Sequence, residues 1–219
     1  MGTAVEHSDG TGRVYLVRHG RTALNARGVL RGRLDPDLDA VGRDEALQLS
    51  DALANSGVTL VVSSPLSRAL QTAEAIASPL RLAVRSDPRL ADRDYGRWAG
   101  WTIEEIEAKW GFLDDAPGVE PATQVRARAL EALEEIRRTS RSPSAAVSHD
   151  AVNRIVLGAL ERSLGLADRI TQPTGCLNVL DWDDTSWSVV AVGLLPREMR
   201  HDALARDAKS GQVRRSTDG

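Results

Sequence analysis

Residues 14–22 read V-Y-L-V-R-H-G-R-T, and the rest of the chain is arranged around this stretch. The four leading residues are apolar β-formers and predict a short buried strand. The strand stops at Arg18, His19 and Gly20, where the glycine permits a tight turn that a ligand can approach closely. Open α/β sheets bind ligands at the carboxyl ends of their strands. An arginine beside a titratable histidine at such an end indicates an anion site, although a surface charge beside an ordinary loop histidine gives the same three letters.

The composition bounds the class of protein. The chain has 219 residues, of which 42% are hydrophobic and 27% charged, as is typical of one soluble globular domain. A net charge of −3 gives no general attraction to nucleic acid or to an anionic membrane, so an anion site must be a local cluster. The single cysteine, Cys176, excludes an internal disulfide and a cysteine-rich metal site. We see no signal peptide and no apolar run that could span a bilayer, so we expect a cytoplasmic location.

Short apolar runs alternate with amphipathic stretches along most of the chain, which predicts an α/β fold. Residues 1–12 and 196–219 are polar or charged, and we expect both to be disordered on either side of one domain at 13–195. Strands are predicted at 14–17, 58–63, 80–84, 145–148, 176–182 and 187–192. The last two form a hairpin and add an antiparallel element to an otherwise parallel sheet. The prediction is a three-layer α/β/α sandwich with a mixed, mostly parallel sheet.

Local signals mark where the helices begin. Ser64 followed by a proline predicts an N-cap and a first helical residue, with Arg68 in the second turn of a helix that ends near residue 78. In the helix at 121–139, Arg126 and Arg128 are predicted to lie on the exposed face. The other predicted helices cover residues 39–55, 102–110 and 151–164.

Four cationic or titratable side chains stand at strand ends or at the start of the next helix. Arg18 and His19 follow the first strand. Arg68 begins the helix after the second strand, and His149 lies between a later strand and a helix N-terminus. Two guanidiniums and two imidazoles suit a dianion, because the planar fork of arginine donates two hydrogen bonds to phosphate at once. A phosphate ester also needs a proton for its departing oxygen, and the irregular stretch with Asp92 and Asp94 offers candidate donors.

These motifs resemble those of the histidine phosphatase superfamily, the phosphoglycerate-mutase-like proteins. The R-H-G signature corresponds to L-V-R-H-G-R-T at 16–22, and the second signature to S-S-P-L-S-R-A-L-Q-T-A at 63–73. The stretch D-P-R-L-A-D at 87–92 resembles the start of the segment that carries the acid, and V-S-H at 147–149 resembles the last signature. One R-H-G is weak evidence. Four signatures in order, each at a predicted strand end or helix start, are strong evidence.

The resemblance implies an enzyme whose first histidine attacks phosphorus and forms a phosphohistidine, which water then hydrolyses. Carried over to this chain, His19 is the nucleophile and must be neutral to attack. Arg18, Arg68 and His149 hold the phosphoryl oxygens and stabilise the transition state, with Asn25 as a further donor. The guanidiniums take the place of a divalent ion, so neither a metal nor another cofactor is expected. The expected partner is a small phosphorylated substrate, not nucleic acid or a membrane, and the protein is expected to be a monomer or homodimer.

The chain departs from the family pattern at the acid. The family commonly has Glu where this chain has Asp92, which is shorter by one methylene. The more distant acid-phosphatase and phytase branch draws its proton from the aspartate after the second histidine, which corresponds here to Asp150. That branch also has disulfides, a greater length and an Arg-x-Pro after R-H-G-x, all of which this chain lacks. We therefore favour Asp92 as the acid, with Asp150 as the alternative.

Two more departures add positive charge to the rim of the predicted site. Arg31 and Gly32 stand where Gln-Gly is common, and Arg21 fills a variable position that is often acidic or an amide. We include all three among the predicted phosphate- and substrate-binding residues. The added charge favours a substrate with a second anionic group.

Three functions fit these motifs. The favoured one is a metal-independent phosphomonoesterase, and the first alternative is a cofactor-dependent phosphoglycerate mutase with the same nucleophile. Mutases of the family carry a long insertion that encloses the substrate, whereas the segment from Asp92 to His149 is short, with only 101–120 available as a cap. The second alternative is a non-catalytic phosphate-binding module. It would not need the neutral nucleophile that this chain keeps, together with both histidines and both arginines.

Overall fold

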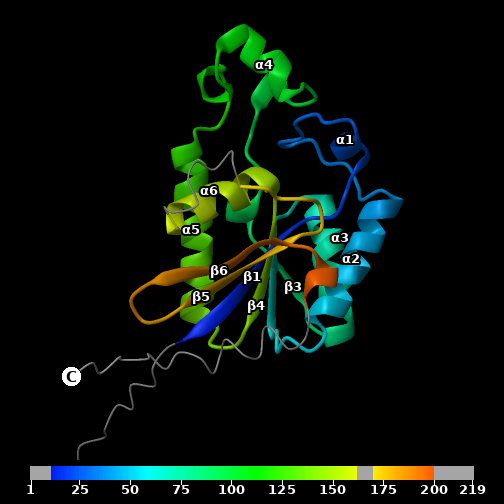
Figure 1. Ribbon diagram of the computed structural model, residues 1–219, viewed down its shortest axis with the longest axis vertical. Coiled ribbons are helices and arrows are strands. Elements are labelled where there is room, and N and C mark those ends of the chain that lie inside the picture. Colours follow the sequence, from blue (N-terminus) through cyan, green and yellow to red (C-terminus); the bar gives the residue numbers. More distant parts are fainter. Residues whose placement is uncertain (1–10, 162–169, 200–219) are drawn as a thin grey trace, which may run out of the picture.

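The computed structural model describes residues 11–161 and 170–199. Its centre is a six-stranded sheet in the order β3-β2-β4-β1-β5-β6 (Figure 1). The strands are β1 (Gly12–Arg18), β2 (Leu60–Ser63), β3 (Val84–Ser86), β4 (Ser144–Ser148), β5 (Leu177–Trp182) and β6 (Trp187–Leu194). The first four strands run parallel, whereas β5 is antiparallel to β1 and β6 is antiparallel to β5. The predicted mixed sheet is confirmed.

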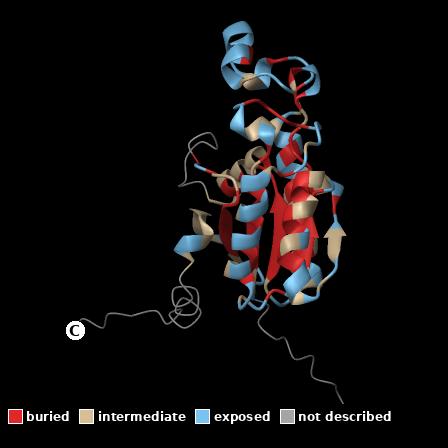
Figure 2. Cartoon of the chain, turned by 90° about the vertical axis from the view of Figure 1, so that its right-hand side faces the viewer, coloured by how far each residue is buried: buried red, intermediate tan, exposed pale blue. Residues whose placement is uncertain are grey.

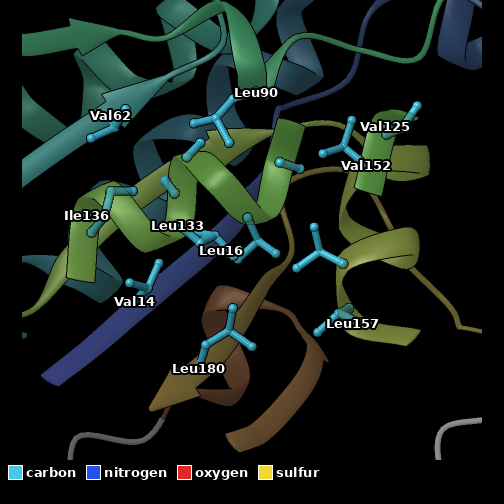
Figure 3. Close-up of a cluster of buried hydrophobic side chains, with 14 of the residues drawn as sticks. Val14, Leu16, Val62, Leu90, Val125, Leu133, Ile136, Val152, Leu157 and Leu180 are labelled. Carbon is cyan, nitrogen blue, oxygen red and sulfur yellow. The ribbon is translucent and has the colours of Figure 1, made fainter. Parts of the chain in front are cut away.

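Helices cover both faces of the sheet. The α-helices are α1 (Ala23–Ala26), α2 (Ala40–Leu53), α3 (Ser67–Leu80), α4 (Ile103–Trp110), α5 (Ala122–Thr139) and α6 (Asp150–Leu160). Successive residues of a strand point to opposite faces, so Leu16 of β1 packs with α5 and α6 while Tyr15 and Val17 pack with α2 and α3. Figure 3 shows the first of these two cores, and Figure 2 shows the buried strands between the helical layers. This is the predicted three-layer sandwich.

Several predicted boundaries around the second helix are wrong. α3 begins at Ser67, not at Ser64. The Ser64 hydroxyl accepts from the Leu66 N–H at 3.3 Å, ahead of the helix, and the first helical residue is bound by the Asp35 carboxylate. This carboxylate accepts hydrogen bonds from the Ser67 backbone N–H at 2.7 Å and hydroxyl at 2.8 Å. The helix then continues to Leu80, where Arg81 takes a left-handed conformation with φ 57°. The next strand therefore comes at Val84–Ser86 instead of 80–84.

The described part of the chain begins and ends with elements near the predicted domain bounds of 13 and 195, which themselves stay a prediction. β1 begins at Gly12, β6 extends to Leu194, and a short 3₁₀ helix at Pro196–Glu198 follows where we predicted the start of a tail. Residues 1–10 and 200–219 of the predicted disordered ends, and residues 162–164 of the predicted last helix, lie outside the described residues. Within 11–161 and 170–199, no helix combines the length and the apolar character needed to cross a membrane.

Two segments extend beyond the carboxyl ends of the parallel strands. The first, between β1 and α2, holds α1. The second, residues 95–120, contains α4 and is here called the cap; Figure 1 shows α4 well above the sheet. The cap has a small core of its own, formed by Leu30, Tyr95, Trp98, Ile106, Ala116 and Val119. Because Leu30 belongs to the first segment, this core joins the two segments above the strand ends.

Candidate active site

The pairing of β1 with β4 brings the two predicted histidines together. Arg18 is in register with Ser148 in these parallel neighbours, and the His19 backbone N–H donates to the Ser148 carbonyl at 3.1 Å. The chain therefore turns away from both strands at the same level. The rings of His19 and His149 lie 5.1 Å apart between centroids, and both residues are fully buried. Residues 130 positions apart in the sequence thus share one site at the carboxyl edge of the sheet.

The contacts of His19 define its tautomer and its charge. Nδ1 lies 2.7 Å from the carbonyl oxygen of Gly20, and because a carbonyl can only accept, Nδ1 carries the proton. Nε2 is therefore unprotonated and accepts a hydrogen bond from Arg68 Nε at 3.3 Å. Burial, and then the charges of Arg68, Arg18 and Arg31, hold the pKa of His19 well below its ordinary value. At neutral pH, His19 thus presents a nucleophilic nitrogen beside a guanidinium.

Arg68 is fully buried and is held by backbone carbonyls. Nη1 donates to the Leu34 carbonyl at 2.8 Å and Nη2 to the Gly32 carbonyl at 3.1 Å. Gly32 has φ +50°, and a Cβ there would lie 3.0 Å from the Tyr95 ring, so the chain needs glycine at this position. The predicted Gly32 therefore acts through its backbone, by orienting Arg68.

Arg18 and Arg31 add two more positive charges. Arg18 Nη1 donates to the Gln172 carbonyl, and Arg31 Nη1 donates to the Val29 carbonyl at 3.0 Å. Both arginines are at most 9% exposed, so Arg31 is part of the buried cluster and not of its rim. Its charge lowers the pKa of both histidines as well as those of Arg18 and Arg68.

The ring of His149 contacts the hydroxyl of Ser64, a residue that the sequence predicted only as a helix N-cap. The His149 Nε2 lies 2.7 Å from this hydroxyl. Burial, and then the charges of Arg68 and His19, hold the pKa of His149 well below its ordinary value. Ser64 directly follows β2, as His149 follows β4. This position at a strand end was the feature of the sequence that could have identified Ser64 as a site residue.

Three polar atoms of these buried side chains are unsatisfied. Arg18 Nε, Arg31 Nε and His149 Nδ1 are all buried and lack a hydrogen-bond partner among the described residues. Buried donors without a partner are costly, and a tetrahedral anion offers several acceptors. The cluster is therefore chemically suited to bind a phosphoryl dianion.

The two candidate acids lie in different surroundings. Asp92 is 2% exposed; its Oδ2 accepts from Arg68 Nη2 at 2.9 Å and lies 3.8 Å from His149 Nδ1. Asp150 lies in the first turn of α6, is paired with Arg154 at 2.6 Å and is 3.6 Å from Arg18. Asp92 is thus placed inside the buried cluster, whereas Asp150 is placed at its edge.

Two predicted binding residues make their contacts elsewhere. Arg21 Nε donates to the Asp39 carboxylate at 2.9 Å, on the partly exposed side of the turn. Asn25 Oδ1 accepts from the backbone N–H of Thr22 at 3.0 Å and from its hydroxyl at 2.8 Å, which completes the capping box of α1. The structure therefore gives Arg21 and Asn25 local structural contacts and does not bring them into contact with the buried cluster.

Together, the fold and the cluster define a class of protein: an α/β protein with buried guanidiniums and two imidazoles at the carboxyl ends of its parallel strands, an arrangement suited to an anion. Residues 14–194 match the model of the histidine phosphatase superfamily (branch 1). The chain belongs to this superfamily, and it is a histidine phosphatase, a phosphoric monoester hydrolase. The predicted recognition is confirmed.

Three similar proteins have more specific names. A glucosyl-3-phosphoglycerate phosphatase of Mycolicibacterium vanbaalenii is 34% identical over 71% of this chain and 73% of its own length. Phosphoserine phosphatase 1 of Hydrogenobacter thermophilus is 30% identical over 81% of this chain and 85% of its own. The solved structure of a mycobacterial glucosyl-3-phosphoglycerate phosphatase with VO3 is 26% identical and covers 83% of this chain and 98% of its own, with a TM-score of 0.71.

Proposed function

We propose that this phosphatase hydrolyses its substrate through a phosphohistidine on His19 and without a metal ion. The observation that carries the proposal is the unprotonated Nε2 of a buried imidazole, which accepts a hydrogen bond from the guanidinium of Arg68. Nε2 attacks phosphorus, the ester P–O bond breaks, and the departing oxygen takes a proton from Asp92. Water then attacks the phosphohistidine and gives its proton back to Asp92, which releases phosphate and restores His19.

The ion pair between Asp92 and Arg68 fits this sequence of steps. In the free enzyme, the guanidinium binds the Asp92 carboxylate at 2.9 Å. An incoming phosphoryl dianion competes for the same donors, because it is the stronger acceptor of a bidentate fork. Substrate binding thereby frees the Asp92 carboxylate. It takes up a proton from the monoanionic phosphate ester or from water and then donates this proton to the departing ester oxygen.

Rapid quenching with a phosphate-labelled ester tests the intermediate. Label is expected on His19 in mapped peptides, together with release of inorganic phosphate. Label on His149, or none during turnover, would contradict the proposal. With 3-phosphoglycerate as substrate, phosphate release is expected to exceed transfer of the phosphoryl group between its hydroxyls; the reverse ratio would favour the mutase.

We also propose that the substrate carries a second anionic group, most simply a carboxylate. Arg31 supports this proposal, since it is buried in the cluster with an unpartnered Nε and occupies a position beyond the two arginines that the motifs share. Phosphoserine and glucosyl-3-phosphoglycerate, the substrates in the relatives' names, both bear a carboxylate near the ester.

A matched pair of substrates tests the role of Arg31. Phosphoethanolamine is phosphoserine without its carboxylate. Arg31→Met is expected to raise KM for phosphoserine about tenfold or more, as for the loss of a charged hydrogen bond, and to change KM for phosphoethanolamine much less. Arg33→Met is the control, because Arg33 is 43% exposed and 3.9 Å from Asp94. An equal effect of Arg31→Met on both substrates would contradict the proposed carboxylate site.

A further inference from the structure

The prediction that Arg128 lies on the exposed face of α5 is wrong. Its side chain lies against the segment that carries Asp92. Its side chain is 17% exposed. Nη1 donates to the carbonyls of Arg89 at 2.7 Å and Ala91 at 2.6 Å, and Nη2 donates to the carbonyl of Asp92 at 3.2 Å. One guanidinium therefore holds three backbone carbonyls of residues 89–92.

The other side of this guanidinium is held by Glu120. Arg128 Nε and Nη2 donate to its two carboxylate oxygens at 2.7 and 2.9 Å. With the three carbonyl contacts, this uses all five N–H donors of the arginine. Glu120 also binds the segment directly: Oε2 accepts from the Asp94 backbone N–H at 3.0 Å, and its own N–H donates to the Asp94 carbonyl at 2.7 Å. The Arg128–Glu120 pair thus forms hydrogen bonds with the backbone before Asp92, at Asp92 itself and after it, at Asp94.

The segment is fixed to the sheet as well. Ser148, the last residue of β4, donates its hydroxyl to the Leu90 carbonyl at 2.8 Å. Consecutive carbonyls from Arg89 to Asp92 are therefore all bound by side chains of β4 and α5. Apart from one 3₁₀ turn at Pro88–Leu90, regular secondary structure does not hold this stretch, so the position of the Asp92 backbone depends on these contacts.

We infer that Arg128, supported by Glu120, is a positioning residue for the acid of this enzyme. The inference rests on the proposed role of Asp92. A displacement of about 1 Å at a reacting group can cost about a hundredfold in rate, so a fixed Asp92 backbone matters for proton transfer. Lysine has the same charge but only three donors on a flexible stem, and it cannot make the five contacts of the planar fork.

The test compares substrates that need a proton with one that hardly needs it. Arg128→Lys and Glu120→Gln are assayed on an alkyl phosphate and on p-nitrophenyl phosphate, whose leaving group is a weak base. Turnover of the alkyl ester is expected to fall about tenfold to a hundredfold, and that of the aryl ester less than about threefold. Arg126→Lys is the matched control on the exposed face of α5 and is expected to change neither rate. The ratio of the two rates in one preparation does not depend on the fraction that is folded.

A double variant separates positioning from a general effect. Arg128→Lys in an Asp92→Asn background is expected to cause no further loss on the alkyl ester, because the acid is already gone. Equal losses on both substrates in the single variants, or multiplied losses in the double variant, would overturn the inference while Asp92 keeps its role. If Asp92→Asn itself shows no dependence on the leaving group, both the inference and the proposed acid are wrong.

Discussion

Asp92 and Asp150 differ in what each carboxylate contacts, and this difference predicts their roles. Asp92 lies between Arg68 and His149, whereas Asp150 is paired with Arg154 on its own helix. Asp92→Asn is expected to lower turnover of alkyl phosphates about 10²–10⁴-fold, the usual contribution of a general acid, with a much smaller loss on p-nitrophenyl phosphate. Asp150→Asn is expected to cost little on either substrate. The opposite pattern in steady-state assays would move the acid to Asp150.

The two buried histidines also predict how stability depends on pH. Burial and the neighbouring guanidiniums keep the pKa of His19 and His149 well below the ordinary value near 6.5, so the unfolded chain binds more protons than the folded one below that pH. Stability is therefore retained above about pH 6.5 and falls as the pH drops. Each histidine is expected to lower the free energy of unfolding as the pH falls below its ordinary pKa. Urea unfolding at pH 7.5 and 5.5 measures the change in the free energy of unfolding with pH. His19→Gln is expected to make this change smaller. The same change in the variant and in the native protein would indicate that His19 is already charged in the folded state.

At the scale of elements, α2 packs backbone to backbone against the turn after β1. A Cβ on Gly42 would lie 2.0 Å from the Arg21 carbonyl oxygen, and one on Gly20 would lie 2.3 Å from the Gly42 carbonyl oxygen. Alanine normally stabilises a helix relative to glycine. Here, Gly42→Ala is instead expected to destabilise the fold by about 1–3 kcal/mol, because α2 must move away from the turn. Turnover should fall as well, since the same turn carries His19.

Leu47→Ala provides the control for that prediction, because Leu47 lies on the same helix and is 59% exposed. Thermal unfolding of both variants, with activity measured on the same samples, makes the comparison. A neutral or stabilising Gly42→Ala would show that the contact between α2 and the turn can relax without cost.

At the scale of the whole molecule, the site gathers buried positive charge in a protein whose net charge is −3. Arg18, Arg31 and Arg68 meet there, and within 11–161 and 170–199 no group of three or more His, Cys, Asp or Glu side chains could hold a metal ion. We predict that phosphatase activity survives dialysis against excess chelator. Loss of activity on chelation, with recovery when a divalent ion is added back, would contradict a mechanism in which arginines take the place of a metal ion.

The sequence by itself determined the strand ends and their chemistry. The apolar β-formers at 14–17 predicted a buried strand, and the motifs around His19, Arg68 and His149 predicted the family and, through it, the sheet. Parallel neighbours bring their carboxyl ends to the same edge, so these three residues had to meet once β1, β2 and β4 paired. The predicted α/β/α sandwich and histidine phosphatase followed from the same local signals.

Only the tertiary structure decided what each polar side chain contacts. Ser64 has the sequence context of an N-cap, and Arg128 has the helical position of an exposed residue, yet the first contacts His149 and the second holds the segment around Asp92. Arg31 and Arg21 were both predicted at the rim, but Arg31 is buried in the cluster and Arg21 pairs with Asp39. The physical reason is that a long polar side chain takes whichever partner the packed elements place within reach. Periodicity and capping rules describe only the chain close to each residue in sequence, and these partners lie 18 to 85 residues away.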